Sequence, residues 1–210
     1  GVNDIGFQQR ADAIGLDSWL QVRRPRPGRY VRDLHVNFNH WTSRNFDGDR
    51  LNFGGNVNAH WTFTNQWSSG GGVNIYGQSF DDRMTRGGPG GYVEHGVNGW
   101  QFFNTDDRKP VSLHWNSNFN RNADGSRSLD LNPFIQLRPG TALSMELGLA
   151  FAKNNDEAQW VTAFEGSDRT HYVFGALRQR TSAMTFRVNY TLSPTLSVQL
   201  YGQPFISAGR

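Results

Sequence analysis

The sequence predicts an all-β fold, an antiparallel up-and-down transmembrane β-barrel of about twelve or more strands. Apolar and polar residues alternate with a period of two along nearly the whole chain, which is the pattern of strands with one apolar face. Several of these segments run for ten residues or more, whereas strands of ordinary domains have about five or six. A tilted strand needs about 9–11 residues to cross a bilayer, so strand length favours a membrane barrel.

The first clear alternating segments lie in residues 33–41 and 51–66. In the first, Leu34, Val36 and Phe38 alternate with a histidine and two asparagines. In the second, every other residue from position 51 to 63 is apolar or glycine, and those between are asparagine, glycine, histidine and threonine. Both segments are therefore expected to be strands with one apolar and one polar face.

The same alternation continues through the second half of the chain. It covers residues 111–120, 128–137, 142–151 and 184–192. No apolar stripe with helical spacing occurs past residue 13, so no helix is expected there. We interpret residues 1–210 as a single barrel domain, with an N-terminal segment at residues 1–12 and strands from residue 13 onward.

Two kinds of connection separate the predicted strands. Tight turns are expected at residues 25–28, 64–66, 138–141 and 193–195, and longer polar loops at residues 43–50, 81–91, 121–127 and 153–156. Outer-membrane barrels have short turns on the periplasmic side and longer loops outside. The connections thus agree with a meander that passes back and forth across a membrane.

Composition excludes several classes of protein. The net charge is only +3, and the arginines that dominate it are scattered, so no nucleic-acid partner is expected. The chain has no cysteine, which rules out disulfides and thiolate metal sites. No apolar run approaches the roughly 18 residues that a membrane helix needs.

The polar face supplies the candidate functional residues. The predicted lumen-lining residues are Asn52, Asn56, Asn58, His60, His114, Asn116, Asn118, Asn120, Asp130, Asn132, Glu146, Arg187 and Asn189. Amide side chains offer donors and acceptors without a net charge, which suits neutral polyhydroxylated solutes such as glycans. Any water-filled barrel also needs a polar interior, so this lining leaves a purely structural role open.

Aromatic residues near the predicted turns indicate the level of a membrane surface. The predicted lipid-interface aromatics are Trp61, Phe63, Trp67, Tyr190 and Tyr201. Aromatic rings of this kind favour the boundary between membrane and water. Outer-membrane lipid is therefore an expected partner.

No motif in the sequence indicates catalysis, a cofactor or a metal. The six histidines show no HExxH spacing, and no GxSxG nucleophile motif is present. His60 and His114 could meet across a lumen, but we interpret both as ordinary polar lining. Glu94, Asp130 and Glu146 are isolated in the sequence, so no carboxylate pair of the kind that glycosidases use is evident.

Two stretches resemble a known family. They are "VNDIGFQQRADAIG" at residues 2–15 and "RQRTSAMTFRVNYTLSPTLSVQLYGQPFISAG" at residues 178–209. They resemble the start and the signature hairpin of an uncharacterised outer-membrane β-barrel domain of Gram-negative bacterial proteins. In that family the barrel follows a periplasmic module similar to family 9 carbohydrate-binding modules. The resemblance implies a location in the bacterial outer membrane.

This sequence departs from the family pattern in two ways. The carbohydrate-binding-like module is absent, and so are the strands that normally follow the "YGQPF" hairpin, together with a terminal aromatic residue. We therefore expect the chain to be a segment of a longer protein, with a periplasmic module or other subunits among its partners.

Four functional hypotheses follow. The first is a non-catalytic outer-membrane barrel with a polar, Asn-rich lumen that passes or binds polar solutes such as glycans. The second is a structural membrane anchor for a periplasmic module or larger assembly. The third is a soluble β-sandwich carbohydrate-binding module, and the fourth a barrel hydrolase with serine and histidine on adjacent strands.

Overall fold

The prediction of an all-β, antiparallel fold is confirmed. The computed structural model describes residues 10–210, and in this part of the chain it contains thirteen strands and no helix. Most of the predicted N-terminal segment 1–12 lies outside the described residues. Within residues 10–210 there is no helix that could span a membrane.

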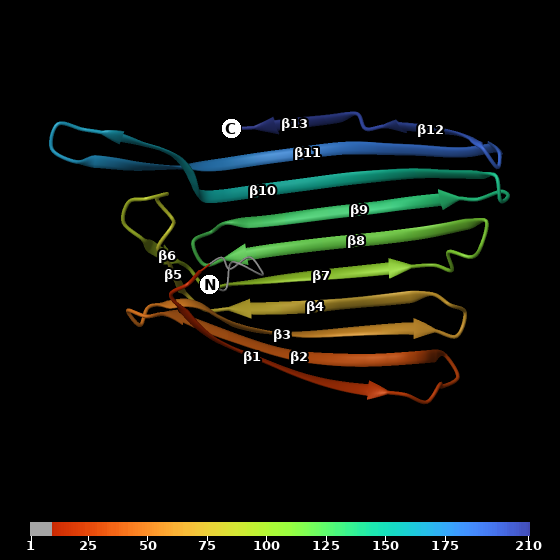
Figure 1. Cartoon of the computed structure of the whole chain (residues 1–210), viewed down its shortest axis with the longest axis horizontal. Helices are drawn as coiled ribbons and strands as arrows, with labels where there is room; N and C mark the ends of the chain where they lie inside the picture. The colour runs from red at the N-terminus through yellow and green to blue at the C-terminus, as the bar shows by residue number, and fades with distance from the viewer. Residues whose placement is uncertain (1–9) are drawn as a thin grey trace.

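The strands form one large sheet and one small hairpin (Figure 1). Their bounds are β1 Ala13–Arg24, β2 Val31–Asn45, β3 Arg50–Phe63, β4 Ser68–Tyr76, β5 Ser79–Asp81, β6 Gly91–Val93, β7 Gly96–Asn104, β8 Val111–Asn122, β9 Arg127–Leu137, β10 Leu143–Glu165, β11 Thr170–Ser193, β12 Leu196–Gly202 and β13 Phe205–Gly209. The large sheet follows the order β1-β2-β3-β4-β7-β8-β9-β10-β11-β12, with β13 also on β11, and β5 pairs only with β6. Apart from the inserted β5–β6 hairpin, this is the predicted meander.

The strand register gives the sheet two distinct faces. Residues that lie directly opposite each other in an antiparallel pair point to the same face. One row of such partners crosses nine strands as Trp19, Asn39, Asn56, Asn74, Asn98, Asn120, Ser128, Asn154 and Gln179. We call its side of the sheet the polar face. The neighbouring row runs as Leu20, Phe38, Val57, Val73, Gly99, Phe119, Leu129, Lys153 and Arg180, and we call its side the apolar face.

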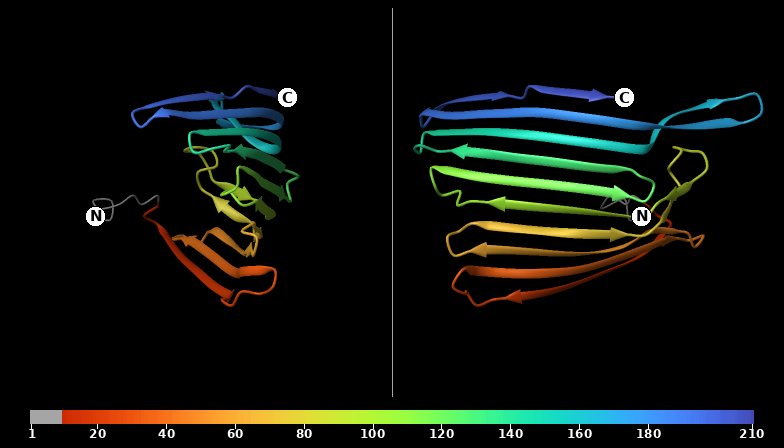
Figure 2. Two further views of the ribbon diagram at one scale, coloured as in Figure 1. Left: turned by 90° about the vertical axis from the view of Figure 1, so that its right-hand side faces the viewer. Right: turned by 180° about the vertical axis from the view of Figure 1, so that it is seen from behind.

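The sheet is curved, and the apolar face is convex. The left panel of Figure 2 shows an arc whose convex side faces away from the viewer of Figure 1. Arg178 of β11 exchanges both backbone hydrogen bonds with Arg210, next to β13, and β13 lies above the rightward-running β11 in Figure 1. With L-amino acids, this geometry directs the Arg178 side chain away from that viewer. Arg178 belongs to the apolar face, so the polar face is the concave one.

The sheet is a single layer without a hydrophobic core. Among the described residues no hydrophobic side chain is buried. On the apolar face Val57 is 50% exposed and Ile75 is 67% exposed. Contiguous apolar surface on this scale marks an interaction surface, so this face needs a partner that the described residues do not provide.

The predicted closure into a barrel is not seen in this chain. Strands β1 and β12 lie at opposite edges of the large sheet within residues 10–210 and do not pair with each other. The structure therefore supports an antiparallel all-β sheet, and the transmembrane barrel stays a prediction.

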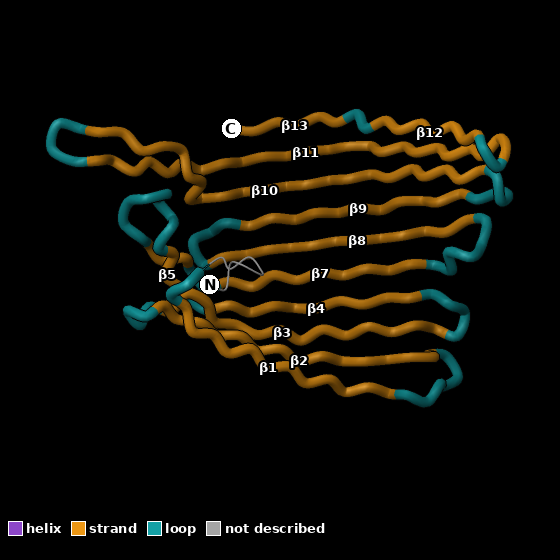
Figure 3. Tube along the Cα trace, in the orientation of Figure 1, coloured by secondary structure: helices purple, strands orange, loops and turns teal. Residues whose placement is uncertain are grey.

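Connections lie at all four positions predicted as tight turns, at one end of the sheet (Figure 3). Those at residues 64–67 and 194–195 are tight, whereas those at residues 25–30 and 138–142 are longer. At the other end the structure corrects one loop. Residues 153–156 lie inside β10, whose pairing with β11 continues as far as Glu165 and Thr170. Polar side chains suggested a loop there, but backbone pairing satisfies N–H and C=O groups whatever side chains the strand carries. The resulting hairpin projects beyond the rest of the sheet (Figure 1).

Two of the other predicted long loops are shorter than expected, and the third, at residues 81–91, is confirmed. The segment 43–50 reduces to a turn between β2 and β3, and 121–127 to a turn between β8 and β9. The segment 81–91 lies between β5 and β6, which form their own small hairpin. The asymmetry between the two ends therefore comes from the projecting β10–β11 hairpin and from the long connection between β5 and β6.

Candidate functional site

A ladder of asparagine side chains crosses the polar face. Asn39 donates from Nδ2 to Asn56 Oδ1 at 2.6 Å, and Asn56 donates to Asn74 Oδ1 at 2.8 Å. Asn74 in turn donates to Asn98 Oδ1 at 2.5 Å. The ladder therefore links β2, β3, β4 and β7 through amides in direct register. Each amide carries two donors and two acceptor lone pairs, so Asn74 retains one donor and one acceptor beyond the ladder.

A second row of amides is joined to this ladder. Asn37 donates to Asn58 Oδ1 at 2.8 Å, and Asn58 donates to Asn56 Oδ1 at 2.9 Å. His60 Nε2 lies 3.2 Å from Asn58 Oδ1. The predicted residues Asn56, Asn58 and His60 thus belong to one hydrogen-bonded network.

Aromatic rings continue the polar face beside this network. The His35 and His60 rings are stacked with centroids 4.9 Å apart. The His60 ring also lies 5.3 Å from Trp100 and 5.8 Å from Phe102. Four rings from β2, β3 and β7 therefore form a cluster, which we call the ring cluster, next to the asparagine ladder.

Glycine in β4 makes room for the ring cluster. A Cβ atom on Gly70 would lie 2.6 Å from Phe102 Cε1 and 2.8 Å from the Ala59 carbonyl oxygen. Such distances are not tolerated, so the Phe102 ring occupies the space that a side chain would otherwise take. Trp100 and Phe102 are absent from the predicted lining, because "GVNGWQFFN" at residues 96–104 places aromatic residues at both phases of the alternation.

A tyrosine spans two strands through another glycine position. The Tyr76 hydroxyl of β4 lies 2.7 Å from Asn120 Oδ1 and 2.5 Å from Asn122 Oδ1, both in β8, and shares its one proton between these two acceptors. Gly96 of the intervening β7 lies in register between Tyr76 and Asn122. A Cβ atom on Gly96 would lie 2.6 Å from the Tyr76 hydroxyl. Glycine therefore lets the tyrosine cross β7, and the network reaches from β2 to β8.

The structure places all the predicted lumen-lining residues on the polar face. In the ladder region, Asn52 accepts from Trp41 Nε1 at 3.1 Å. Further along the sheet the opposed pairs are Asn116 with Asn132, Asn118 with Asp130, Glu146 with Arg187, and Ser144 with Asn189. The opposition of Glu146 and Arg187 sets unlike charges side by side, the favourable arrangement for a cross-strand pair.

His60 and His114 are not brought together. His114 Nδ1 lies 3.0 Å from Asn104 Oδ1, and its Nε2 lies 3.1 Å from Ser112 Oγ. Its ring stacks on Phe134 with centroids 4.2 Å apart, so it has partners of its own at a different place on the sheet. Among residues 10–210 no group of three or more histidine, aspartate or glutamate side chains could hold a metal ion.

The contacts of His114 have the connectivity of a hydrolase triad: serine, histidine and an orienting amide. A nucleophile must also reach the substrate, and the Ser112 side chain is only 1% exposed. The arrangement therefore fits a buried hydrogen-bonded support for the strand end better than a catalytic centre.

Four of the five predicted interface aromatics lie on the apolar face or beside it. Trp61 and Phe63 project from the end of β3 at the tight turns, and Tyr190 lies opposite Leu143. The Trp67 ring packs edge-on against the Phe103 ring, with ring centroids 5.5 Å apart. Tyr201 is the exception.

Tyr201 lies on the polar face. It is opposite Arg187, whose guanidinium carbon lies 5.3 Å from the centre of its ring. Position near a turn suggested an interface role, but the register of β12 against β11 decides the face. This placement differs from the sequence prediction.

The apolar face carries a band of alternating apolar residues of the same length on four strands. On four consecutive strands the alternating apolar residues span Val111–Phe119, Leu129–Leu137, Leu143–Phe151 and Met184–Leu192, nine residues each. In the register the spans of β8 and β9 are level, and those of β10 and β11 are each offset by two residues from the preceding strand. We refer to them together as the apolar band.

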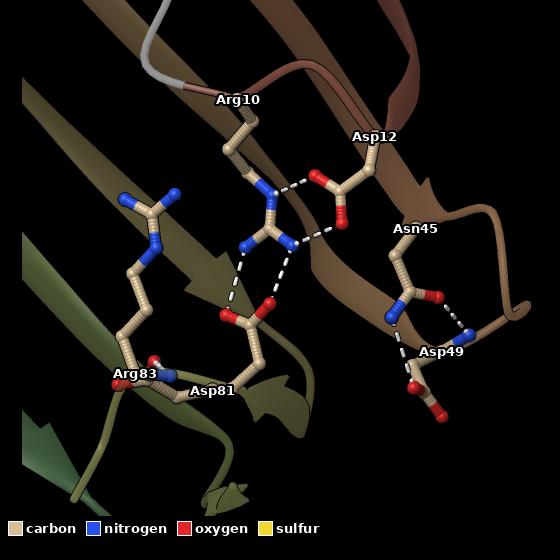
Figure 4. A network of polar contacts seen from close by, with 7 residues as sticks. Arg10, Asp12, Asn45, Asp49, Asp81 and Arg83 are labelled. Atoms are coloured by element: carbon tan, nitrogen blue, oxygen red, sulfur yellow. Dashed lines mark hydrogen bonds and ion pairs between the residues drawn. The ribbon is translucent and has the colours of Figure 1, made fainter. Parts of the chain in front are cut away.

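At the end opposite the tight turns, charged contacts fix the segment between β5 and β6. Arg10 donates to Asp82 Oδ1 at 2.8 Å and to Asp12 Oδ1 at 3.1 Å, as Figure 4 shows for Arg10 and Asp12. These hydrogen bonds hold the pKa of both carboxyl groups below its ordinary value. On the other side, the Arg86 guanidinium carbon lies 5.7 Å from the Trp160 ring of β10. The segment therefore connects the region preceding β1 to the projecting hairpin.

Comparison with known proteins gives one match. A family model described as "Domain of unknown function (DUF5916)" matches residues 1–210. The match includes both stretches on which the sequence resemblance rests. No curated protein matches the chain, and no solved structure does.

Proposed function

The chain belongs to the DUF5916 family of domains of unknown function, and we propose that it forms the wall of a β-barrel in the bacterial outer membrane. In this proposal the convex apolar face meets lipid, and the concave polar face borders a water-filled lumen. The lumen passes or binds polar solutes such as glycans and performs no catalysis.

The observation that carries the proposal is the direction of curvature. In a soluble β-sandwich the apolar faces of two sheets turn inward onto a shared core. Here the apolar face is the outer side of the arc, so it cannot enclose a core of its own. A polar inside and an apolar outside are the arrangement of a membrane barrel.

The apolar band supports the same placement. Nine residues of alternating strand, as in Leu143–Phe151, match the roughly 9–11 that a tilted strand uses to cross a bilayer. Because every backbone N–H and C=O group must be satisfied in lipid, only a closed barrel is stable there. The proposal therefore requires further strands, or further copies of the chain, that join the edges at β1 and β12.

The polar face supports a glycan as the solute. Sugars present hydroxyl groups, which amides recognise as both donors and acceptors, and weakly polar C–H faces, which pack on aromatic rings. The asparagine ladder and the ring cluster with Trp100 and Phe102 supply both kinds of surface side by side. A lumen selective for ions would instead be expected to show rings of one charge.

The first experiment tests the membrane barrel. The chain, with its natural flanking sequence, is produced in a Gram-negative host, and the outer-membrane fraction is run on SDS gels unheated and boiled. A change in mobility on boiling is expected, because closed barrels resist cold SDS. Recovery as a detergent-free soluble protein with one mobility would rule the proposal out.

The second experiment separates passage from anchoring. Purified protein is inserted into a planar bilayer, and conductance is measured while maltooligosaccharides are added. Steps of conductance that sugars reduce are expected. A folded, membrane-inserted protein with no conductance and no sugar binding would favour the structural anchor.

A further inference from the structure

Cationic side chains gather at one place on the apolar face. They come from β9, β10, β11 and the residue after β13, and they line a hollow of about 510 Å³. We call Arg127, Lys153, Arg178, Arg180 and Arg210 the basic cluster. The register explains their proximity, since Lys153 is opposite Arg180, and Arg127 and Arg178 both lie opposite Asn155.

The basic cluster has little internal compensation for its charge. Glu157 Oε1 lies 2.5 Å from Arg178 Nη2, and within residues 10–210 no other ion pair joins a carboxylate to the cluster. The second terminal nitrogen of the Arg178 guanidinium, Nη1, is buried without a hydrogen-bond partner. A buried unpaired donor is costly, and like charges at short range repel. An anion in the hollow relieves the repulsion among these cations.

The position of the cluster indicates where that anion comes from. Along β9 and β10 the next residues on the same face after Leu129 and Phe151 are Arg127 and Lys153. The cations therefore begin where the apolar band ends. In a membrane this is the level of the lipid headgroups, where basic side chains meet anionic lipid.

We propose that the basic cluster binds the phosphate groups of an anionic membrane lipid, a proposal that rests on the membrane placement proposed above. Arginine guanidinium groups bind phosphate oxygens in pairs, and several cations around one hollow suit a headgroup with more than one phosphate. The cluster lies at the end with the projecting hairpin, and outer-membrane barrels carry their longer connections on the external side. A lipid of that leaflet with a bisphosphorylated headgroup, such as lipid A, is the expected class.

The test measures binding of lipid A to the detergent-solubilised full-length protein by native mass spectrometry. One variant removes three cations of the cluster: Arg127→Gln, Lys153→Gln and Arg180→Gln. The matched control removes three at the opposite end of the sheet: Arg24→Gln, Arg26→Gln and Arg138→Gln. Lipid A should bind wild type and control equally, and the cluster variant at least tenfold more weakly. Phosphatidylcholine should bind all three proteins alike.

The outcomes separate this inference from the proposed function. Equal binding of lipid A to the cluster variant and the control would overturn the inference alone. Displacement of lipid A by an equal concentration of inorganic pyrophosphate would overturn it in favour of a site for soluble phosphates. A wild-type protein without heat-modifiable mobility would overturn the membrane barrel, whether or not lipid A binds in detergent.

Discussion

Arginine substitutions along one strand give a direct test of the apolar band. Leu147 is the middle residue of the span Leu143–Phe151, lies on the apolar face and is 48% exposed. If the band spans the hydrocarbon core, Leu147→Arg places a charge near the bilayer midplane. Arginine there destabilises a membrane barrel by about 2–4 kcal/mol, and near the interface by about 0–1 kcal/mol.

Two controls isolate the effect of depth and face. Leu143→Arg changes the same face at the end of the band, and we expect it to cost less than about 1 kcal/mol. Thr185→Arg changes the polar face at the height of Leu147, opposite Gly148, which leaves room for a long side chain. We expect it to be close to neutral.

The assay is guanidinium unfolding of the protein folded into phospholipid vesicles. The expected loss for Leu147→Arg corresponds to a change of roughly 30-fold to 700-fold in the folding equilibrium, and that for Leu143→Arg to less than about 5-fold, because about 1.4 kcal/mol is tenfold. Equal losses for Leu147→Arg and Leu143→Arg would refute the depth profile. A loss for Thr185→Arg as large as for Leu147→Arg would refute the assignment of the faces.

Three other predictions concern the polar face and the ion pairs of Arg10 at the end opposite the tight turns. Asn74→Leu removes two ladder hydrogen bonds, one with Asn56 and one with Asn98. It should lower the free energy of unfolding by about 1–3 kcal/mol in the same assay. Unchanged stability would show that the ladder does not stabilise the sheet. Gly70→Ala should lower stability by displacing the Phe102 ring, whose Cε1 atom would lie 2.6 Å from the new Cβ. The double variant with Phe102→Ala should recover part of this lost stability. If the stability losses of the two single variants simply add, the ring is not the obstacle. Asp82 has its pKa lowered from 3.8 by the hydrogen bond from Arg10, so the contact stabilises the fold fully above about pH 4 and is lost as the pH falls through the lower folded-state pKa. The protection of the amides in residues 82–90, which is their exchange rate relative to the intrinsic rate at the same pH, should therefore be high at pH 6 and fall as the pH drops through the folded-state pKa of Asp82, whereas Arg10→Gln should give low protection already at pH 6.

Period-two alternation was sufficient to predict the sheet and the face of each lining residue, because strand geometry alone decides which side chains share a face. It could not show which residues become neighbours. Of the four ladder residues only Asn56 was among the predicted lining residues. Asn39 lies in a segment that was predicted as a strand but was not included, Asn74 comes two residues after three consecutive glycines, and Asn98 lies in "GVNGWQFFN", where the alternation is masked. Asn74 and Asn98 are evident only from the register of β4 against its neighbours.

Two further differences between the sequence predictions and the structure also come from strand pairing. The polar run from Lys153 to Asp156 indicated a loop by composition, but its backbone pairs with β11 along the projecting hairpin. Tyr201 was grouped with the interface aromatics by its nearness to a turn, and its pairing with Arg187 sets it on the other face. Strand pairing decides both cases, and the residues around each position do not reveal that pairing.

The absence of a core raises the question of what fixes the register in this sheet. A one-residue slip of a strand exchanges its two faces, and a buried core normally forbids it. Here the apolar face is uncovered, so specificity must also come from the polar face. The asparagine ladder favours one register, because Asn56 and Asn74 each accept a hydrogen bond from one neighbouring strand and donate one to the other. The fit of Phe102 over Gly70 and the reach of Tyr76 over Gly96 add two steric constraints on the same strands. The residues that we propose to contact solutes are thus also the ones that hold β2, β3, β4, β7 and β8 in register, which explains why so polar a surface is also so rich in internal hydrogen bonds.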